Sequence, residues 1–296
     1  MTGPDWLQRG ARTLAPGNVR IRMGLKRHKE LASGHRLLRS HSLRQTSSLK
    51  PLRFSWADAI SAAEWRIYRT AIHALRSAGI EFLVGGGFAR AGYTGHWRDT
   101  KDIDFYVRPQ DREPAEHALS RAGFADYFQK LPYDRAWIYR SYKRNVIVDI
   151  IWAMANQRAN VDEAWFRYAP QLKIRGERLS LVPPEELLWC KLYIIQRDRC
   201  DWTDIFNLVH EHGAQMDWAR LIRRMEDDVP LLQAMLNVYE WLCPTAVKKL
   251  PASLWRRLCA AQQTMRTRPP THDRIRLLDS RTWFGARTGK YQKLEV

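Results

Sequence analysis

Cysteine is scarce in this sequence, and nothing in its spacing suggests a disulfide framework. The 296 residues include only four cysteines, at positions 190, 200, 243 and 259. They form no closely spaced pairs, so the sequence predicts free thiols and a reducing compartment, the cytoplasm. Long apolar runs are also missing, and none approaches the roughly 20 residues that span a bilayer. The sequence therefore argues against an integral membrane protein, and residues 1–54 lack the apolar segment of a secretory signal.

Acidic residues are few at both ends of the chain. Residues 1–53 hold 12 basic and 2 acidic side chains, residues 251–296 hold 10 and 3, and the nearly neutral stretch between them holds 27 and 26. The net charge of +18 therefore belongs to the ends. We predict a disordered basic arm over 1–53, because little there can bury enough apolar surface to offset the cost of ordering. A nucleic-acid-binding arm, an organelle transit peptide and translated upstream sequence, with Met23 as a later start, are the alternatives.

Between the basic ends, the hydrophobic pattern predicts two domains. Residues 54–182 alternate helical and strand patterns, which indicates an α/β domain with a mixed sheet and flanking helices. The predicted helices cover 55–77, a short segment from 88, and 115–122. The predicted strands cover 81–84, 102–107, 136–142 and 145–152, with a turn at Lys143-Arg144 between the last two. A basic tail is predicted from 266.

Residues 183–265 predict a helical domain. The helices cover 185–197, 202–210, 217–225, 230–242 and 254–265, with Asp217 as an N-cap and Pro230 in a first helical turn. Six tryptophans fall at apolar helical positions of the two domains and are predicted to pack in the core: Trp65, Trp165, Trp189, Trp218, Trp241 and Trp255.

A glycine-rich turn follows the first predicted strand. It reads Phe82-Leu-Val-Gly-Gly-Gly87 and leads into a helix. Glycines allow the backbone to approach a phosphate closely, and a helix N-terminus offers free N–H groups and a positive dipole. A plain tight turn is the alternative, since glycine turns before helices are common.

Three aspartates occupy positions that predict a metal site. Asp102 and Asp104 lie two apart on a strand, so their carboxylates project together, and such a pair repels unless a cation sits between them. Magnesium prefers one or two carboxylates plus substrate phosphates, and a solvated strand edge is the alternative for this pair. Asp149 stands within the apolar run Val146–Trp152 and needs a partner if buried, because an unpaired buried charge is costly. A metal, or an ion pair with an arginine or lysine, would provide one.

Together these residues resemble the nucleotidyltransferase superfamily, which is DNA polymerase β-like. Its signature is a hydrophobic strand, a Gly-Gly or Gly-Ser pair and a helix, followed by Asp-x-Asp and a third carboxylate on later strands. Leu83-Val-Gly-Gly86 and Arg98-Asp-Thr-Lys-Asp-Ile-Asp104 resemble the minimal bacterial branch that includes AbiEii-type toxins. The segment Val182–Lys191 with Arg197, Asp201 and Asp204 is similar to the helical segment that follows the catalytic domain in that branch.

The resemblance implies a metal-dependent enzyme that transfers a nucleoside monophosphate from an NTP to an acceptor hydroxyl. Asp102, Asp104 and Asp149 would be catalytic and would bind two Mg²⁺ ions, or Mn²⁺ in their place. The NTP-binding residues would be the three glycines, with Gly85-Gly86 the favoured pair, and three cations: Gly85, Gly86, Gly87, Arg98, Lys101 and Lys191. A protein, a tRNA 3′ end and a small molecule remain open as acceptors, and the basic ends favour RNA contact.

The rival hypothesis is a catalytically inactive protein of the same fold that acts as an RNA-binding or toxin–antitoxin partner. The presence of all three carboxylates counts against it. Two other patterns fail on spacing. Gly285 to Lys290 has one residue too few between its glycines for a P-loop, and Tyr291 stands where Ser or Thr would be. Four residues could be considered as zinc ligands, but they include no Cys-x-x-Cys pair, so a zinc site is not predicted: Cys190, Cys200, His210 and His212.

Overall fold

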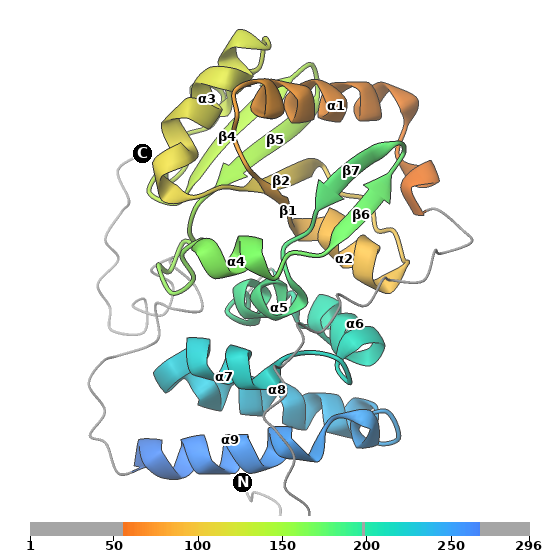
Figure 1. The fold of residues 1–296 in the computed structure, drawn as a ribbon, viewed down its shortest axis with the longest axis vertical. Helices are drawn as coiled ribbons and strands as arrows, with labels where there is room; N and C mark the ends of the chain where they lie inside the picture. Colours follow the sequence, from red (N-terminus) through yellow and green to blue (C-terminus); the bar gives the residue numbers. More distant parts are fainter. Residues whose placement is uncertain (1–55, 197–198, 267–296) are drawn as a thin grey trace, which may run out of the picture. The chain divides into compact units, whose positions relative to one another are not determined.

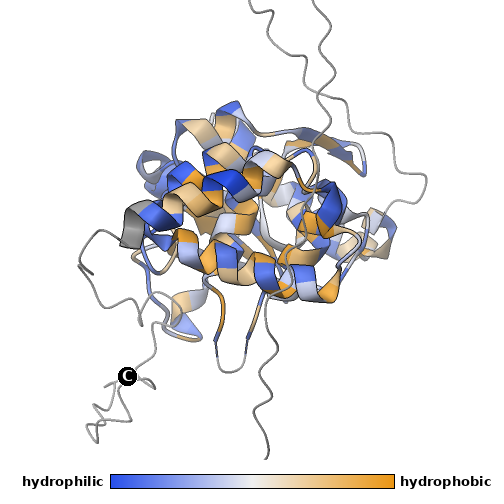
Figure 2. Ribbon diagram, turned by 90° about the horizontal axis from the view of Figure 1, so that it is seen from below, coloured by the Kyte–Doolittle hydropathy of each residue, from blue (hydrophilic) through white to orange (hydrophobic). Residues whose placement is uncertain are grey.

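The computed structural model describes residues 56–196 and 199–266. The predicted basic arm, the tail beyond 266, Arg197 and the segment Gly285–Lys290 lie outside the described residues. Within the described ranges, no helix combines the length and the apolar character that crossing a membrane requires. Figure 2 agrees, because hydrophilic and apolar residues are mixed along the helices.

A five-stranded mixed sheet confirms the predicted α/β region (Figure 1). Its spatial order is β1-β2-β5-β4-β3, and only β2 and β5 run parallel among the paired strands. The strands are β1 (Leu83–Val84), β2 (Asp102–Tyr106), β3 (Ala125–Asp126), β4 (Ile138–Lys143) and β5 (Val146–Ile151). Strand alternation explains β2, where Ile103 and Phe105 are fully buried and the two aspartates project from the other face.

The β4–β5 hairpin turns one residue later than predicted. Its turn residues are Arg144 and Asn145, and Arg144 has a φ of 56°. A left-handed residue at the first position of a two-residue loop suits the twist of the flanking strands. The shift changes every cross-strand pair. It places Arg140 opposite Asp149, whereas the predicted turn would have placed Ile138 there.

Three helices flank this sheet. The helices α1 (Ala62–Ser77) and α3 (Arg112–Arg121) pack against each other and against β5, whereas α2 (Gly86–Thr94) packs on β2. The predicted helix start at residue 55 is wrong, because residues 56–59 form a separate 3₁₀ turn. A capping box starts α1 at Ser61: its hydroxyl accepts from the Glu64 N–H, and the Glu64 carboxylate accepts from the Ser61 N–H.

Residues 163–180 contain three elements that the sequence pattern did not predict. These are α4 (Glu163–Arg167) and a hairpin of β6 (Gln171–Ile174) and β7 (Glu177–Ser180). The hairpin turns at Arg175-Gly176, with φ values of 46° and 92°, as two-residue hairpin loops require. Each strand has four residues, too few for a clear alternating pattern.

The C-terminal region is helical, as predicted. Its helices are α5 (Pro184–Leu192), α6 (Trp202–His212), α7 (Trp218–Met225), α8 (Val229–Leu242) and α9 (Ala252–Arg266). The Asp217 cap is confirmed, since its carboxylate accepts from the Arg220 N–H at 3.0 Å, and Pro230 lies in the first turn of α8. The predicted end of the first helix at Arg197 is wrong, because α5 stops at Leu192.

Core packing holds for most of the six tryptophans but not for all. Trp65, Trp165, Trp189 and Trp218 are buried, and Trp255 is partly buried. The prediction is wrong for Trp241, which is 80% exposed. Its helix α8 buries the face that carries Leu232, Leu236 and Tyr239, and position 241 projects away from it.

Candidate active site

The three predicted carboxylates meet at one point of the sheet. Asp102 and Asp104 lie on β2 and Asp149 on β5, with Asp104 directly opposite Asp149 in the parallel register. One carboxylate oxygen from each lies within 4.8 Å of the others. Asp149 is 1% exposed, and the other two are half-buried. The fold therefore gathers, from positions 45 residues apart, an all-oxygen donor set of the kind that hard divalent cations prefer.

The negative charges of the three carboxylates are not fully balanced by neighbouring cations. Burial raises the pKa of Asp104 well above its ordinary range, and the charges of Asp102 and Asp149 raise it further. Burial also raises the pKa of Asp149, to about 6, although the hydrogen bonds and charge of Arg140 oppose the rise. Three carboxylates held this close disfavour full ionisation unless a cation joins them. The residues present thus fit a divalent metal ion.

Asp149 has also found the arginine partner that the sequence left open as an alternative. Arg140, its cross-strand neighbour on β4, donates from Nε to Oδ1 at 2.9 Å and from Nη2 to Oδ2 at 2.6 Å. The same Nη2 lies 3.6 Å from Oδ2 of Asp102. On the other side of Asp102, Oδ1 accepts a 2.7 Å hydrogen bond from the Thr100 hydroxyl. Asp149 therefore belongs both to the carboxylate cluster and to an ion pair with Arg140.

The glycine turn lies against the acidic strand. The Gly85 N–H donates to the Asp104 carbonyl at 2.9 Å, and α2 begins at Gly86. A Cβ on Gly85 would lie 2.2 Å from the Tyr106 ring, and one on Gly86, where φ is +51°, would lie 1.6 Å from Oδ2 of Asp104. At Gly87 the nearest side-chain atom would be 3.4 Å away, on Thr100. Glycine is therefore required at positions 85 and 86, where the backbone of the turn lies too close to β2 for a side chain, but not at position 87.

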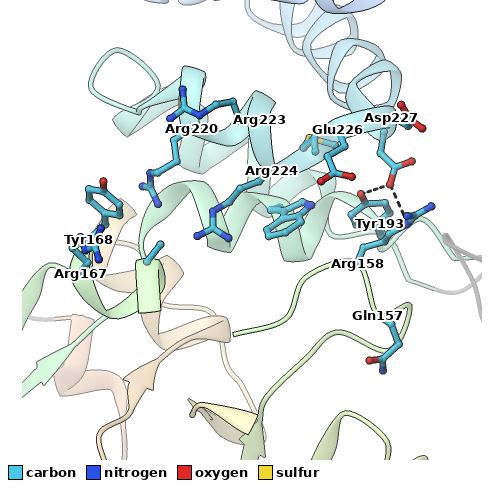
Figure 3. Close-up of a pocket in the computed structure, with 14 residues that line it drawn as sticks. Gln157, Arg158, Arg167, Tyr168, Tyr193, Arg220, Arg223, Arg224, Glu226 and Asp227 are labelled. Atoms are coloured by element: carbon cyan, nitrogen blue, oxygen red, sulfur yellow. Dashed lines mark hydrogen bonds and ion pairs between the residues drawn. The ribbon is translucent and has the colours of Figure 1, made fainter. Parts of the chain in front are cut away.

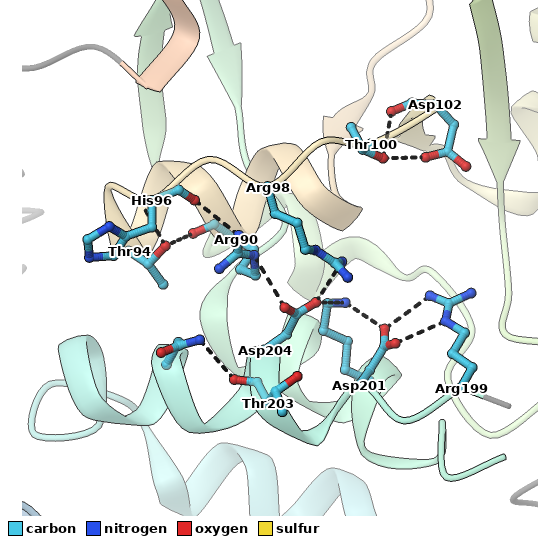
Figure 4. Close-up of polar contacts among 12 residues, drawn as sticks. Arg90, Thr94, His96, Arg98, Thr100, Asp102, Arg199, Asp201, Thr203 and Asp204 are labelled. Carbon is cyan, nitrogen blue, oxygen red and sulfur yellow. Dashed lines mark hydrogen bonds and ion pairs between the residues drawn. The ribbon is translucent and has the colours of Figure 1, made fainter. Parts of the chain in front are cut away.

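A cationic cluster from α2, α5 and the loops before β2 and α6 surrounds two buried aspartates (Figure 4). Lys191, on α5, is buried and contacts Asp201 at 2.7 Å and Asp204 at 2.8 Å. Asp201 also pairs with Arg199 at 2.9 Å, and Asp204 pairs with Arg98 at 3.1 Å. The buried Arg90 of α2 adds a 3.4 Å contact to Asp204. Four cations around two anions leave an excess of two positive charges.

This cluster acts on the carboxylate site electrostatically. The charge of Lys191 lowers the pKa of Asp104, against burial and its acidic neighbours. The hydrogen bond to Asp201 raises the pKa of Arg199, and the charges of Asp104 and Asp102 add to the rise. Of the predicted cations, Lys191 and Arg98 thus belong to the cluster, whereas Lys101 is exposed next to β2. The combination of negative and positive charge suits a triphosphate with bound cations.

Sequence reasoning missed three basic residues of this region: Arg90, Arg140 and Arg199. Arg140 could have been found by counting back from the hairpin turn, had the turn been placed at Arg144-Asn145. Nothing local marks Arg90 or Arg199 among the many arginines of the chain. Their partners, Asp204 and Asp201, come from other segments or from a loop whose path the sequence does not specify.

A separate polar pocket of about 710 Å³ lies against α4, α5 and α7 (Figure 3). Trp189 and Tyr193 line it, and Lys191 projects to the other side of α5, because helix positions two apart point in nearly opposite directions. Of the arginines that line it, Arg220 pairs with Glu185 and Glu186, and Arg224 pairs with Asp162 and Glu186. None of the predicted site residues lines this pocket.

Solved structures resemble the chain at low identity. The solution structure of the antibiotic-resistance factor ANT(2″)-Ia is 16% identical, with a TM-score of 0.40 over 71% of this chain and 100% of that one. The lincomycin-bound lincosamide antibiotic adenylyltransferase LnuA is 14% identical, with a TM-score of 0.37 over 50% and 96%. JHP933 from Helicobacter pylori is 12% identical, with a TM-score of 0.34 over 78% and 100%. No curated protein matches the sequence.

A family model described as an uncharacterised nucleotidyltransferase matches residues 26–242. This range includes the whole five-stranded sheet, the carboxylate site and the helices through α8. The architecture is the predicted one, a mixed sheet with flanking helices followed by a helical region. The AbiEii-type branch is not distinguished by these matches and stays a prediction. Because the match covers most of its length, the chain belongs to the family of uncharacterised nucleotidyltransferases.

Proposed function

We propose that this protein transfers a nucleoside monophosphate from an NTP to an acceptor hydroxyl and releases pyrophosphate. The observation that carries the proposal is the meeting of Asp102, Asp104 and Asp149 within 4.8 Å, next to the glycine turn that begins α2. We place the catalytic domain at 54–182 and the helical domain at 183–265. The free state of all four cysteines fits a reducing cytoplasm.

The proposed metal ligands are the three carboxylates. When bound, two Mg²⁺ ions, or Mn²⁺, would activate the acceptor hydroxyl and stabilise the leaving pyrophosphate during an in-line displacement. The chain's own contribution is to hold Asp102 and Asp104 side by side on one strand and Asp149 across from them. Asp149, with a pKa raised to about 6 by burial, also suits a group that accepts the proton of the acceptor hydroxyl.

The proposed triphosphate site is the N-terminal end of α2 together with the cationic cluster. The backbone at Gly86 and Gly87 offers N–H groups without side chains in the way, and Gly85, whose own N–H donates to the Asp104 carbonyl, lets the backbone approach a phosphate closely. Arg98, whose side chain is 59% exposed, can turn from Asp204 toward a phosphate. Lys191 is buried on Asp201 and Asp204, so we propose that it holds the cluster in place and contributes charge rather than direct contact.

Two exposed basic groups complete the triphosphate site in this proposal. Lys101 is exposed beside Asp102, and Arg199, with a side chain 60% exposed, pairs with Asp201. Both can reach solvent-borne phosphates without leaving an unpaired buried charge behind, because Asp201 keeps Lys191 as its partner.

The acceptor is a protein hydroxyl, a tRNA 3′ end or a small molecule. The basic ends favour an RNA contact, because phosphate neutralisation supplies affinity without sequence specificity. We therefore expect removal of residues 1–53 to weaken tRNA binding and to reduce its salt dependence. Unchanged affinity and salt slope would remove this support for an RNA acceptor.

The test of the proposed function is label transfer. The full chain is incubated with Mg²⁺ and each α-labelled NTP, together with total tRNA, lysate protein or a small-molecule extract. Label should enter one acceptor fraction with the wild-type protein and should be lost in Asp102→Ala and Asp104→Ala. Asp134→Asn is the matched control, since Asp134 is an exposed turn residue whose role as a hydrogen-bond acceptor asparagine can fill. Metal-dependent transfer that survives both alanine variants would refute the proposal.

Nucleotide binding distinguishes the proposed enzyme from the alternative hypothesis of a catalytically inactive protein with the same fold. A ligand that binds only the folded state raises its stability by RT ln(1 + [L]/Kd). We expect at least one NTP, with Mg²⁺, to raise the melting temperature of the wild-type protein. No shift with any nucleotide and no label transfer would favour the RNA-binding or toxin–antitoxin partner.

A further inference from the structure

The ion pair between Arg140 and Asp149 lies where a second metal ion would need its ligands. Both oxygens of Asp149 accept hydrogen bonds from Arg140, at 2.9 and 2.6 Å. Asp149 is 1% exposed, so it has no solvent-facing side from which another cation could approach freely. A bidentate guanidinium–carboxylate pair is among the strongest hydrogen-bonded arrangements in proteins. Asp149 is therefore already neutralised.

The guanidinium also stands between two of the three carboxylates. Its Nη2 is 2.6 Å from Oδ2 of Asp149 and 3.6 Å from Oδ2 of Asp102. An Mg²⁺ ion binds oxygen at about 2.0–2.1 Å, so an ion that bridges Asp102 and Asp149 would require Arg140 to move. Repulsion between the two cations adds to that cost. Arg140 holds Asp102 less closely, at 3.6 Å against 2.6 Å for Asp149, so the pair Asp102–Asp104 is less obstructed.

The charge balance leads to the same result. Three ionised carboxylates and Arg140 sum to two negative charges, which a single divalent ion neutralises. Without Arg140 the three carboxylates carry three negative charges, and one divalent ion leaves one of them unneutralised. A bound triphosphate changes this balance again, because its own oxygens attract both Arg140 and a further cation. The Arg140 side chain is 33% exposed and so is free to turn toward such a ligand.

We propose that Arg140 takes the place of the second metal ion in the nucleotide-free protein. The free protein then binds one divalent ion, on Asp102 and Asp104, and the second ion binds only together with the NTP, when Arg140 releases Asp149. Arg140 is in this view a positioning residue that couples metal loading to nucleotide binding. The inference rests on the proposed metal-dependent transfer at this site, and its test counts ions rather than turnover.

The experiment is a Mn²⁺ titration of the full chain, with free Mn²⁺ followed by electron paramagnetic resonance. The wild-type protein should bind one Mn²⁺ without nucleotide and two with the fitting one of the four α,β-methylene NTP analogues. Arg140→Gln should bind two without nucleotide. Arg135→Gln is the matched control, because Arg135 lies five residues before Arg140, is 45% exposed and pairs with Asp126, outside the carboxylate site. Two equivalent ions on the nucleotide-free wild-type protein would overturn the inference.

A second variant keeps the test decisive if Arg140→Gln fails to fold. Asp149→Asn should leave the affinity for the first Mn²⁺ at its wild-type value and abolish the nucleotide-dependent second ion. Asp102→Asn should weaken the first ion by at least the roughly tenfold that loss of even an outer-shell partner costs. Loss of the first ion in Asp149→Asn would overturn the inference. It would leave the proposed function standing, which fails instead if the wild-type protein binds no Mn²⁺ with or without nucleotide.

Discussion

Gly86 offers the sharpest single-atom perturbation of the carboxylate site. A Cβ at this position would lie 1.6 Å from Oδ2 and 2.8 Å from Cγ of Asp104. Contacts below 3.0 Å are not tolerated, so in the Gly86→Ala variant the carboxylate of Asp104 must move away by about 1.4 Å. A misplacement of about 1 Å can cost about 100-fold in rate. We therefore expect Gly86→Ala to lose about 100-fold in label transfer and to bind Mn²⁺ more weakly.

The same substitution has a separate cost in stability. At φ +51° an alanine is strained by about 1–2 kcal/mol. Gly79→Ala measures this backbone strain by itself. Gly79 lies in the turn after α1 with a φ of +70°, and an added Cβ would have no atom within 4 Å. Gly79→Ala should lose about this much free energy of unfolding in urea and keep full Mn²⁺ affinity and transfer, whereas Gly86→Ala should lose at least as much, because it adds the contact with Asp104.

Gly87 provides the complementary control for stability. It lies in the first turn of α2, and its added Cβ would meet Thr100 at an ordinary 3.4 Å. Alanine there should raise the free energy of unfolding by up to about 0.5–1 kcal/mol, because glycine is disfavoured inside helices. Wild-type Mn²⁺ affinity and transfer in Gly86→Ala would refute the reasoning that close packing of the turn on Asp104 positions the site.

Two further predictions concern the cationic cluster. Lys191→Met should lower the free energy of unfolding by about 3 kcal/mol, because it leaves Asp201 and Asp204 buried without their shared partner. Lys173→Met, at an exposed position, should change the free energy of unfolding little. Equal urea midpoints for the two variants would contradict this prediction. Burial would raise the pKa of Asp201, but hydrogen bonds from Arg199 and the charge of Lys191 outweigh it and hold the pKa below 3.8. The ionised carboxylate therefore contributes its full stability above about pH 4 and loses it as the pH falls through the lower folded-state value, so Asp201→Asn should show a flatter fall in unfolding free energy below about pH 4. Parallel slopes in the two proteins would count against that assignment.

Local sequence determined most of the elements that carry the site. The apolar strand before Gly85 and the alternation of aspartate with Ile103 and Phe105 predicted the turn and β2, and the structure confirms both. The helical region after Pro184 followed from its spacing in the same way. These features depend on side-chain periodicity and backbone conformation, which neighbouring residues set. Where the pattern was short, as in the β6–β7 hairpin, or where a capping box divided a helical run at Ser61, the sequence did not predict the element bounds.

Only the tertiary structure decided which partners the site residues have. Asp149 could take a metal or an arginine on sequence grounds, and a one-residue shift of the hairpin turn decided that Arg140 faces it. Lys191 looked like a candidate phosphate ligand, yet the packing of α5 on α6 buries it between Asp201 and Asp204. Both outcomes depend on register and helix packing between distant segments. A sequence specifies the chemical groups and their local spacing, whereas the pairing of charges depends on distances of a few ångströms that only the assembled fold sets.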